Sequence, residues 1–249
     1  MKVDYIQHCG SDLTVVNAAR VSFDKESALH IDLVEDPDPD APYLGSVRHK
    51  VCVTSLKDKD KKLVQYLARN KHTSPFNHSF LTVRVKAPIF VARQLVKHKF
   101  MPWNEVSRRY VDSEPEFYKP DVWRFKADNV KQGSRSSGLT SHEVNTELCN
   151  REEANGYIRT PDEGNEDCLD TYRNLLQMGV CPEQARMVLP QSMYTEWYWS
   201  GTLGAFLDML KLRLKPDTQQ ETRKIAEMIA EIVKEHWPVS YDAILKEIA

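Results

Sequence analysis

The sequence lacks paired cysteines. Its five cysteines, at positions 9, 52, 149, 168 and 181, are odd in number and widely spaced, and no Cys-x-x-Cys pair occurs. This pattern excludes a disulfide framework, a zinc ribbon and a redox dithiol. We therefore predict a protein of a reducing, cytoplasmic compartment, and we predict no metal site.

Long apolar runs and an excess of one charge are also missing. The segment Met1–Ile6 has no apolar core long enough for a signal peptide, and no run is long enough to span a membrane. The formal net charge is -2 and the isoelectric point is about 6.5, which argues against a surface built to attract polyanions. We expect neither a membrane nor a nucleic acid among the partners.

The composition that remains is that of an ordinary soluble protein, with 41% hydrophobic and 28% charged residues in 249. A chain of this length can form one domain with a sizeable core. We predict a single α+β domain over residues 1–249, with a small sheet and long packed helices.

Hydrophobic periodicity predicts the elements of the first half. It indicates a strand at 2–7, helices at 12–20 and up to about 70, a strand at 80–86, and a helix over 87–96 with Pro88 at its first position. Met101-Pro102 interrupts helical structure, because the residue before a proline avoids helical angles, and we predict a loop at 104–109. Three prolines and three carboxylates exclude regular structure at 36–42.

Helices are predicted to dominate the second half. Residues 125–165 are rich in Ser, Gly, Asn and Glu and predict loops with at most one short helix. Helices are predicted at 166–178, at 182–190 and at 203–213. Thr218-Gln219-Gln220-Glu221 resembles a capping box, and a long final helix then carries the apolar stripe Ile225, Met228, Ile229, Ile232 and Val233.

The densest group of functional side chains lies at 93–110. Lys97-His98-Lys99 follows the predicted helix, and Ser107 comes after seven further residues, next to Arg108-Arg109. Guanidinium and ammonium groups bind phosphate, whereas Ser107 and Glu105 can bind the polar edges of a base or sugar. A solvated basic face or an RNA-binding patch is the alternative. Because the chain has no net positive charge, we favour a nucleotide pocket.

The arrangement of Lys97-His98-Lys99, seven residues, then Ser107 resembles the signature of the flavin-dependent thymidylate synthases, which is normally Arg-His-Arg, seven residues, Ser. Other blocks similar to that family follow in the same order: Ala18–Phe23, His72–His78, Val85–Gln94, Ala185–Pro190 and Leu210–Arg213. The resemblance covers most of the chain and implies the α+β fold of that family. Residues 28–58 and 125–165 look unlike the family, and we predict insertions there.

The resemblance also implies site residues. Those expected to bind FAD are His72, Ser74, Asn77, Lys97, His98 and Lys99. Those expected to bind dUMP are Gln94, Glu105, Ser107, Arg109, Arg186 and Arg213. Arg213 and Ser107 are the expected catalytic residues, Arg213 because a fixed cation facing the pyrimidine stabilises negative charge developing on the ring. We interpret Ser107 as holding the nucleotide rather than attacking it, because no adjacent base is evident.

Some of these residues also fit simpler interpretations, and some positions depart from the family. Arg186 fits a structural salt bridge, and Arg213 fits a cation at a helix C-terminus. Both arginines of the motif are lysines here, which keep the charge but lose the planar fork. Where the family tends to carry Asn, Arg and Asn, this chain has Thr202, Gly204 and Asp208. The changes concern the FAD-binding positions.

The reaction implied by the resemblance is reductive methylation of dUMP to dTMP. FAD is the implied cofactor, 5,10-methylenetetrahydrofolate the carbon donor and NADPH the reductant, in a homotetramer with shared active sites. A diverged flavoprotein acting on another nucleotide and a nucleic-acid-binding module using 93–109 are the alternatives. The thiolate chemistry of ordinary thymidylate synthases is disfavoured, because no motif of that family surrounds Cys181.

Overall fold

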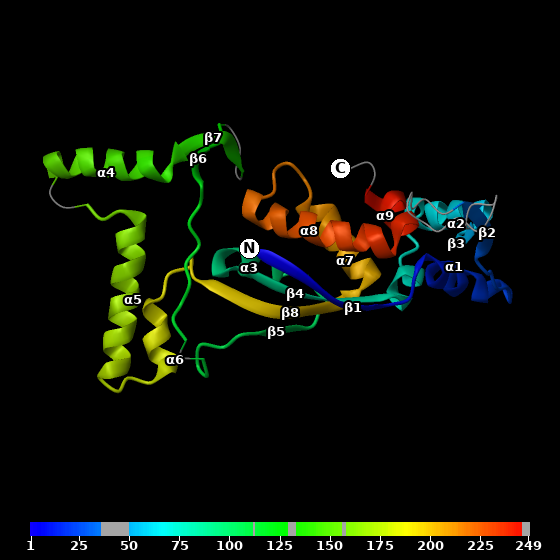
Figure 1. Ribbon diagram of the computed structural model, residues 1–249, viewed down its shortest axis with the longest axis horizontal. Helices are drawn as coiled ribbons and strands as arrows, with labels where there is room; N and C mark the ends of the chain where they lie inside the picture. Colours follow the sequence, from blue (N-terminus) through cyan, green and yellow to red (C-terminus); the bar gives the residue numbers. More distant parts are fainter. Residues whose placement is uncertain (36–49, 112, 129–132, 156–157, 246–249) are drawn as a thin grey trace, which may run out of the picture. The chain divides into compact units, whose positions relative to one another are not determined.

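The computed structural model describes residues 1–35, 50–111, 113–128, 133–155 and 158–245. Helices and small antiparallel sheets are mixed along the chain, which confirms the α+β class (Figure 1). Contacts divide the chain into two compact units. Unit 1 comprises Met1–Gln7, Thr82–Gly201 and Leu212–Ile229, and unit 2 comprises His8–Leu81, Thr202–Lys211 and Ala230–Ala249. That residues 1–249 act as one catalytic domain stays a prediction.

A four-stranded sheet carries the elements of the predicted site. Its strands, in spatial order, are β1 (Lys2–Cys9), β4 (Phe80–Pro88), β8 (Tyr194–Thr202) and β5 (Trp103–Glu105) (Figure 1). The predicted strands at 2–7 and 80–86 are confirmed, and Leu81, Val83 and Val85 alternate into the core. β5 pairs antiparallel with β8, so the loop predicted at 104–109 is wrong for its first two residues.

Strand β8 was not predicted, although its sequence alternates. Thr195, Trp197 and Trp199 are buried, whereas Tyr198 between the two tryptophans is exposed. Trp197 stacks on Trp103 of β5, with ring centroids 4.2 Å apart and an interplanar angle of 17°. Large aromatic side chains favour strand positions when they pack across a sheet in this way.

Helix α3 (Ile89–Leu95) follows β4 without a loop. Pro88 is its N-cap residue, with extended angles of φ -67° and ψ 153°, so the helix begins one position later than predicted. It also ends early, which leaves Lys97-His98-Lys99 in the turn beyond it. Phe100 closes that turn at a φ of 62°, a conformation that bulky residues rarely adopt.

The loops predicted at 125–165 are wrong for most of that segment. It contains the antiparallel pair β6 (Val122–Lys126) and β7 (Ser134–Thr140), helix α4 (Ser141–Asn155) and the start of α5 (Pro161–Gln177). α4 has few apolar residues and no apolar stripe, so periodicity could not reveal it. α5 begins before position 166 because Thr160 and Glu163 form a reciprocal capping box.

The helices of the last third agree better with expectation. The segment predicted as one helix at 182–190 is α6 (Pro182–Ala185) followed by a 3₁₀ turn, η3 (Arg186–Val188). α7 (Leu203–Arg213) has the predicted bounds. α8 (Gln220–His236) buries Ile225, Ile229 and Val233, and a separate helix, α9 (Pro238–Leu245), follows it.

The predicted capping box at 218–221 is wrong. The Thr218 hydroxyl donates to the carbonyl oxygen of Leu212 (3.1 Å), and the Thr218 N–H donates to the carbonyl oxygen of Lys215 (3.0 Å). The Glu221 carboxylate accepts two hydrogen bonds from Arg124. The Thr-x-x-Glu spacing fits a local motif, but both side chains have other partners, which lie six residues away for Thr218 and 97 residues away for Glu221.

Unit 2 contains the elements near the N-terminus. They are α1 (Asp12–Arg20), η1 (Val21–Phe23), the antiparallel pair β2 (His30–Glu35) and β3 (Lys50–Ser55), α2 (Asp58–Arg69) and η2 (Ser74–His78). The helices predicted at 12–20 and up to about 70 are confirmed. The segment 36–42, predicted to be irregular, lies outside the described residues. In the described chain, no helix is both long and apolar enough to cross a membrane.

Candidate active site

Three of the predicted site residues meet where α7 ends. Gln94 lies on α3, His98 lies in the turn after it, and Arg213 is the last residue of α7. Arg213 Nε donates a hydrogen bond to His98 Nε2 (3.0 Å), and its Nη2 donates to the carbonyl oxygen of Gln94 (2.9 Å). Within the described residues, Nη1 takes part in no hydrogen bond, so it remains available to a ligand. The site therefore contains a cation held in place by two acceptors.

His98 is a neutral partner for this cation. Burial, and then the charge of Arg213, lowers the pKa of His98 to about 4. Because Nε2 accepts from Arg213, the single proton of the neutral imidazole lies on Nδ1. Burial also lowers the pKa of Arg213, but a guanidinium keeps its proton at neutral pH.

The depressed pKa of His98 predicts a pH-dependent stability. Between about pH 6.5 and pH 4, unfolded His98 binds a proton and folded His98 does not, so its contribution to stability is full above pH 6.5 and is lost as the pH falls to about 4. His98→Gln keeps an acceptor for Arg213 but does not titrate. In thermal melts from pH 7 to pH 4, the variant should lose less stability than the parent. Identical losses in both proteins would contradict this assignment.

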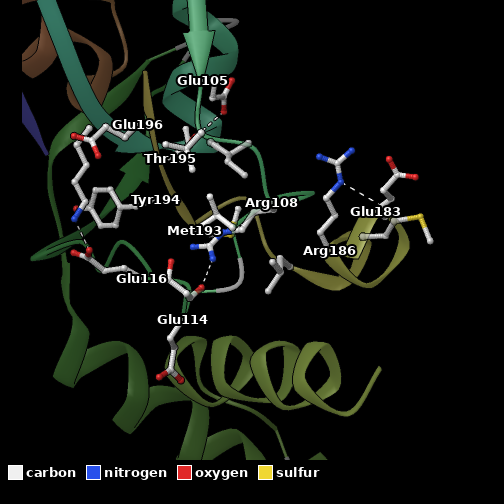
Figure 2. A pocket seen from close by; sticks show the side chains of 17 residues that line it. Glu105, Arg108, Glu114, Glu116, Glu183, Arg186, Met193, Tyr194, Thr195 and Glu196 are labelled. Carbon is white, nitrogen blue, oxygen red and sulfur yellow. Dashed lines mark hydrogen bonds and ion pairs between the residues drawn. The ribbon is translucent and has the colours of Figure 1, made fainter. Parts of the chain in front are cut away.

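A cavity of ≈ 700 Å³ in unit 1, the Glu105 cavity, holds two more predicted residues (Figure 2). Glu105 Oε1 accepts a hydrogen bond from Thr195 (2.7 Å), and its Oε2 accepts one from the Trp103 indole (3.0 Å). Arg186 lines the same cavity from η3, and its Nε donates to the carbonyl oxygen of Glu183 (3.3 Å). The remaining lining includes Lys86, Ile89, Arg108, Met193 and Tyr194.

Ser107 and Arg109 lie on the turn that follows β5. The Ser107 hydroxyl accepts from the Arg109 backbone N–H (3.4 Å) and from Arg109 Nε (3.3 Å), and Arg109 Nη1 is 3.7 Å from Glu183. Among the described residues, no histidine or carboxylate is hydrogen-bonded to this hydroxyl. A serine without such a base is not activated as a nucleophile, and its role in holding the nucleotide stays a prediction.

A second cavity of unit 1, of ≈ 650 Å³, contains the fixed cation and is called the Arg213 cavity. Its lining comprises Gln94, Arg124, Gly133, Ser134, Leu212, Arg213, Lys215, Asp217, Thr218 and Gln219. Of these, sequence reasoning identified only Gln94 and Arg213. Arg124 and Gln219 have no sequence signal of their own, because Arg124 depends on Glu221, 97 residues away, and Gln219 depends on Gln94, 125 residues away.

The predicted residues of unit 2 lie near η2. His72 lines a cavity of ≈ 160 Å³ together with apolar side chains that include Leu67, Phe76 and Leu207. Asn77 Oδ1 accepts a hydrogen bond from Thr202 (2.8 Å). A Cβ atom on Gly204 would lie 2.4 Å from Asn77 Oδ1, so any larger residue at position 204 requires the Asn77 side chain to shift. Ser74 is exposed on η2.

Lys97 and Lys99 are both exposed in the turn after α3. In the part of the chain that the structure describes, neither ammonium group takes part in an ion pair. Two cations flank the neutral His98 and remain available to an anionic ligand. The described residues contain no group of three or more His, Cys, Asp and Glu side chains that could hold a metal ion.

Sequence comparisons match almost the whole chain. The family model described as "thymidylate synthase complementing protein" matches residues 4–239. A flavin-dependent thymidylate synthase of Thermus thermophilus is 36% identical over 241 residues, covering 97% of this chain and 74% of that protein. The enzyme of the same name from Thermotoga neapolitana is 34% identical over 246 residues, covering 98% of this chain and 90% of that protein.

A solved structure is similar over the same extent. The UMP/dUMP methylase PolB from Streptomyces cacaoi, bound with 5-Br dUMP, has a TM-score of 0.71 and 27% sequence identity, and the match covers 99% of this chain and 95% of that chain. The fold, the order of the motifs and the extent of these matches all indicate the same family. The chain belongs to the flavin-dependent thymidylate synthase family.

Proposed function

We propose that this protein catalyses the reductive methylation of dUMP to dTMP, with FAD as cofactor, 5,10-methylenetetrahydrofolate as carbon donor and NADPH as reductant. The observation that carries the proposal is the position of the Arg213 guanidinium. Hydrogen bonds hold it beside His98, the neutral histidine of the Lys97-His98-Lys99 motif. Such a preorganised cation stabilises negative charge that develops on a pyrimidine ring during reaction.

The residues present fit an FAD diphosphate and ring system. Lys97 and Lys99 offer exposed cations for phosphate oxygens, and His98 offers a neutral imidazole between them. In unit 2, the His72 cavity is lined by both apolar and polar side chains, a combination that is typical of ligand sites. The Asn77 side-chain oxygen accepts from Thr202, and among the described residues its amide nitrogen has no partner and is available to a ligand. When bound, FAD supplies the reducing electrons that it takes from NADPH.

The candidate dUMP residues are divided between two cavities. Gln94 and Arg213 line one, and Glu105 and Arg186 line the other, with Ser107 and Arg109 on the adjacent turn. Because neither cavity contains the whole set, we propose a homotetramer in which the Arg213 cavity of one subunit and the Glu105 cavity of another hold the same nucleotide. Arg109 and Arg186 then bind its phosphate, and Arg213 and Gln94 bind the pyrimidine.

Ser107→Ala should keep measurable dTMP formation. The hydroxyl contacts Arg109 and has no base among the described residues, so its removal affects how the nucleotide is held and leaves bond formation possible. We expect a higher KM for dUMP with a smaller change in kcat, and no covalent adduct at position 107 by mass spectrometry. A variant that binds FAD and dUMP normally but forms no dTMP would restore the nucleophile interpretation.

The proposal is tested by incubating the protein with FAD, NADPH, methylenetetrahydrofolate and dUMP and separating the nucleotides by chromatography. We expect dTMP from the complete mixture and none when FAD is withheld from the flavin-free protein. Because PolB is described as a UMP/dUMP methylase, a parallel reaction contains UMP. Product from UMP alone would favour a flavoprotein acting on another nucleotide. A protein whose spectrum shows bound flavin but which methylates neither nucleotide would refute the proposal.

A further inference from the structure

A buried ion pair lies beside the Arg213 cavity. Arg124 of β6 donates two parallel hydrogen bonds, each of 2.8 Å, to the two carboxylate oxygens of Glu221 on α8. The side chains are 17% and 5% exposed. Arg124 Nε also donates to Ser134 (2.8 Å), so the guanidinium is held on both sides. Bidentate pairs of this kind are among the strongest polar contacts in proteins.

Glu221 is therefore kept as a carboxylate. Burial tends to raise its pKa, but the hydrogen bonds from Arg124 and its other donors outweigh that effect, and the pKa lies below the usual value. The Tyr118 hydroxyl contributes a longer hydrogen bond (3.4 Å), and burial raises the pKa of Tyr118 to about 12, so this hydroxyl stays a donor. An ionised carboxylate can only accept hydrogen bonds.

This property fixes the orientation of two side-chain amides in turn. Gln219 Nε2 donates to Glu221 Oε2 (3.0 Å), so Gln219 must present its oxygen to the next residue. That residue is Gln94, whose Nε2 donates to Gln219 Oε1. The fully buried Thr222 hydroxyl then donates to Gln94 Oε1 (3.1 Å). Each amide has one orientation that satisfies both of its neighbours.

Within the described residues, the Gln94 side chain retains one N–H and one oxygen lone pair for a ligand. A primary amide has two N–H donors and an oxygen that accepts two hydrogen bonds, and the protein uses one of each. The imide edge of uracil presents an N3–H donor next to carbonyl acceptors, which matches this pair. Cytosine presents an unprotonated N3 next to an amino group, which requires the amide in the reverse orientation.

We propose that Glu221, held by Arg124, is a positioning residue that fixes the Gln94 amide and thereby makes the site prefer a uracil edge to a cytosine edge. The inference rests on the proposed function, because it takes dUMP as the substrate. Glu221 acts through Gln219 and Gln94 and does not itself touch the nucleotide. We call Arg124, Glu221, Gln219, Gln94 and Thr222 the amide relay.

Glu221→Gln tests the relay with little change of shape. The new amide can donate or accept, so Gln219 and Gln94 can both reverse. Titration calorimetry of dUMP and of dCMP into the FAD-loaded protein measures the discrimination between the two nucleotides. We expect the preference for dUMP to fall by about tenfold or more, the effect of one mispaired hydrogen bond in a polar site. FAD binding, followed by flavin fluorescence, should not change.

Glu227→Gln is the matched control, because it makes the same substitution on the same helix and removes the exposed pair with Arg223 (3.5 Å). It should leave the dUMP preference unchanged. Thr222→Val is a second variant, which removes the donor to Gln94 Oε1 without changing any charge, and Thr222→Ser restores that donor. If Glu221→Gln does not fold, the preference should still fall by about threefold or more in Thr222→Val and return in Thr222→Ser.

A purely structural role for Glu221 would lower the melting temperature but leave the ratio of the two affinities unchanged. A folded Glu221→Gln variant, or a Thr222→Val variant, whose ratio stays within about twofold of the parent would overturn the relay while leaving the proposed function standing. A parent protein that binds FAD but not dUMP would overturn the proposed function, and the relay with it.

Discussion

Arg213→Ala should lower kcat for dTMP formation by about 100- to 1,000-fold, the loss typical when a preorganised donor to developing charge is removed. His98 Nε2 and the Gln94 carbonyl oxygen hold the guanidinium in one position. A side chain without these two hydrogen bonds would not place a charge at the same point. Arg213→Lys keeps the charge but cannot reach both acceptors with one ammonium group, and we expect an intermediate kcat.

Steady-state kinetics with flavin titration separates this effect from loss of cofactor. FAD binding should persist in Arg213→Ala, because the cations expected to hold the diphosphate are Lys97 and Lys99. Lys224→Ala, an exposed substitution on α8, is the control and should keep the parent rate. A kcat for Arg213→Ala within about threefold of the parent would remove Arg213 from the reaction's charge stabilisation.

Arg186→Ala should weaken dUMP binding by about 10- to 150-fold, which corresponds to about 1.5–3 kcal/mol for a charge-assisted hydrogen bond. Arg186 uses Nε to hold the Glu183 carbonyl oxygen and lines the Glu105 cavity, where its planar fork suits a phosphate (Figure 2). Calorimetric titration with dUMP measures the loss.

The control for this variant is Arg151→Ala, which removes an exposed ion pair with Glu147 on α4. Its dUMP affinity should equal that of the parent. If Arg186→Ala folds, by circular dichroism, and binds dUMP as tightly as the parent, then Arg186 serves the structural role that the sequence also allowed.

Local sequence signals predicted the elements whose burial is periodic. Val83 and Val85 alternate into the core of β4, and Ile225, Ile229 and Val233 form the buried stripe of α8. Two elements were missed. α4 has no apolar stripe that could have indicated a helix. β8 does alternate, with Trp197 and Trp199 buried and Tyr198 exposed, but this alternation was not interpreted as a strand.

The residues of the candidate site also divide into those that local sequence motifs predicted and those that they did not. Gln94, His98 and Arg213 were named from motif residues, and the structure joins them by hydrogen bonds. The pairing of Arg124 with Glu221 could not be predicted from the sequence. Arg124 lies on the β6–β7 hairpin, and the composition of that region predicts loops. Glu221 was instead interpreted as part of a capping box, since its local spacing satisfied a short-range rule. The distant partner Arg124, and not the local spacing, determines which hydrogen bonds the Glu221 side chain makes.

The folate product tests the central claim most directly, because that claim is that flavin, not folate, provides the reducing electrons. The protein is supplied with FAD, NADPH, methylenetetrahydrofolate and dUMP, and the folates and nucleotides are quantified together by mass spectrometry. We predict tetrahydrofolate in equal amount to dTMP, with one NADPH oxidised for each dTMP formed. Dihydrofolate in equal amount to dTMP, without a requirement for FAD, would contradict the account.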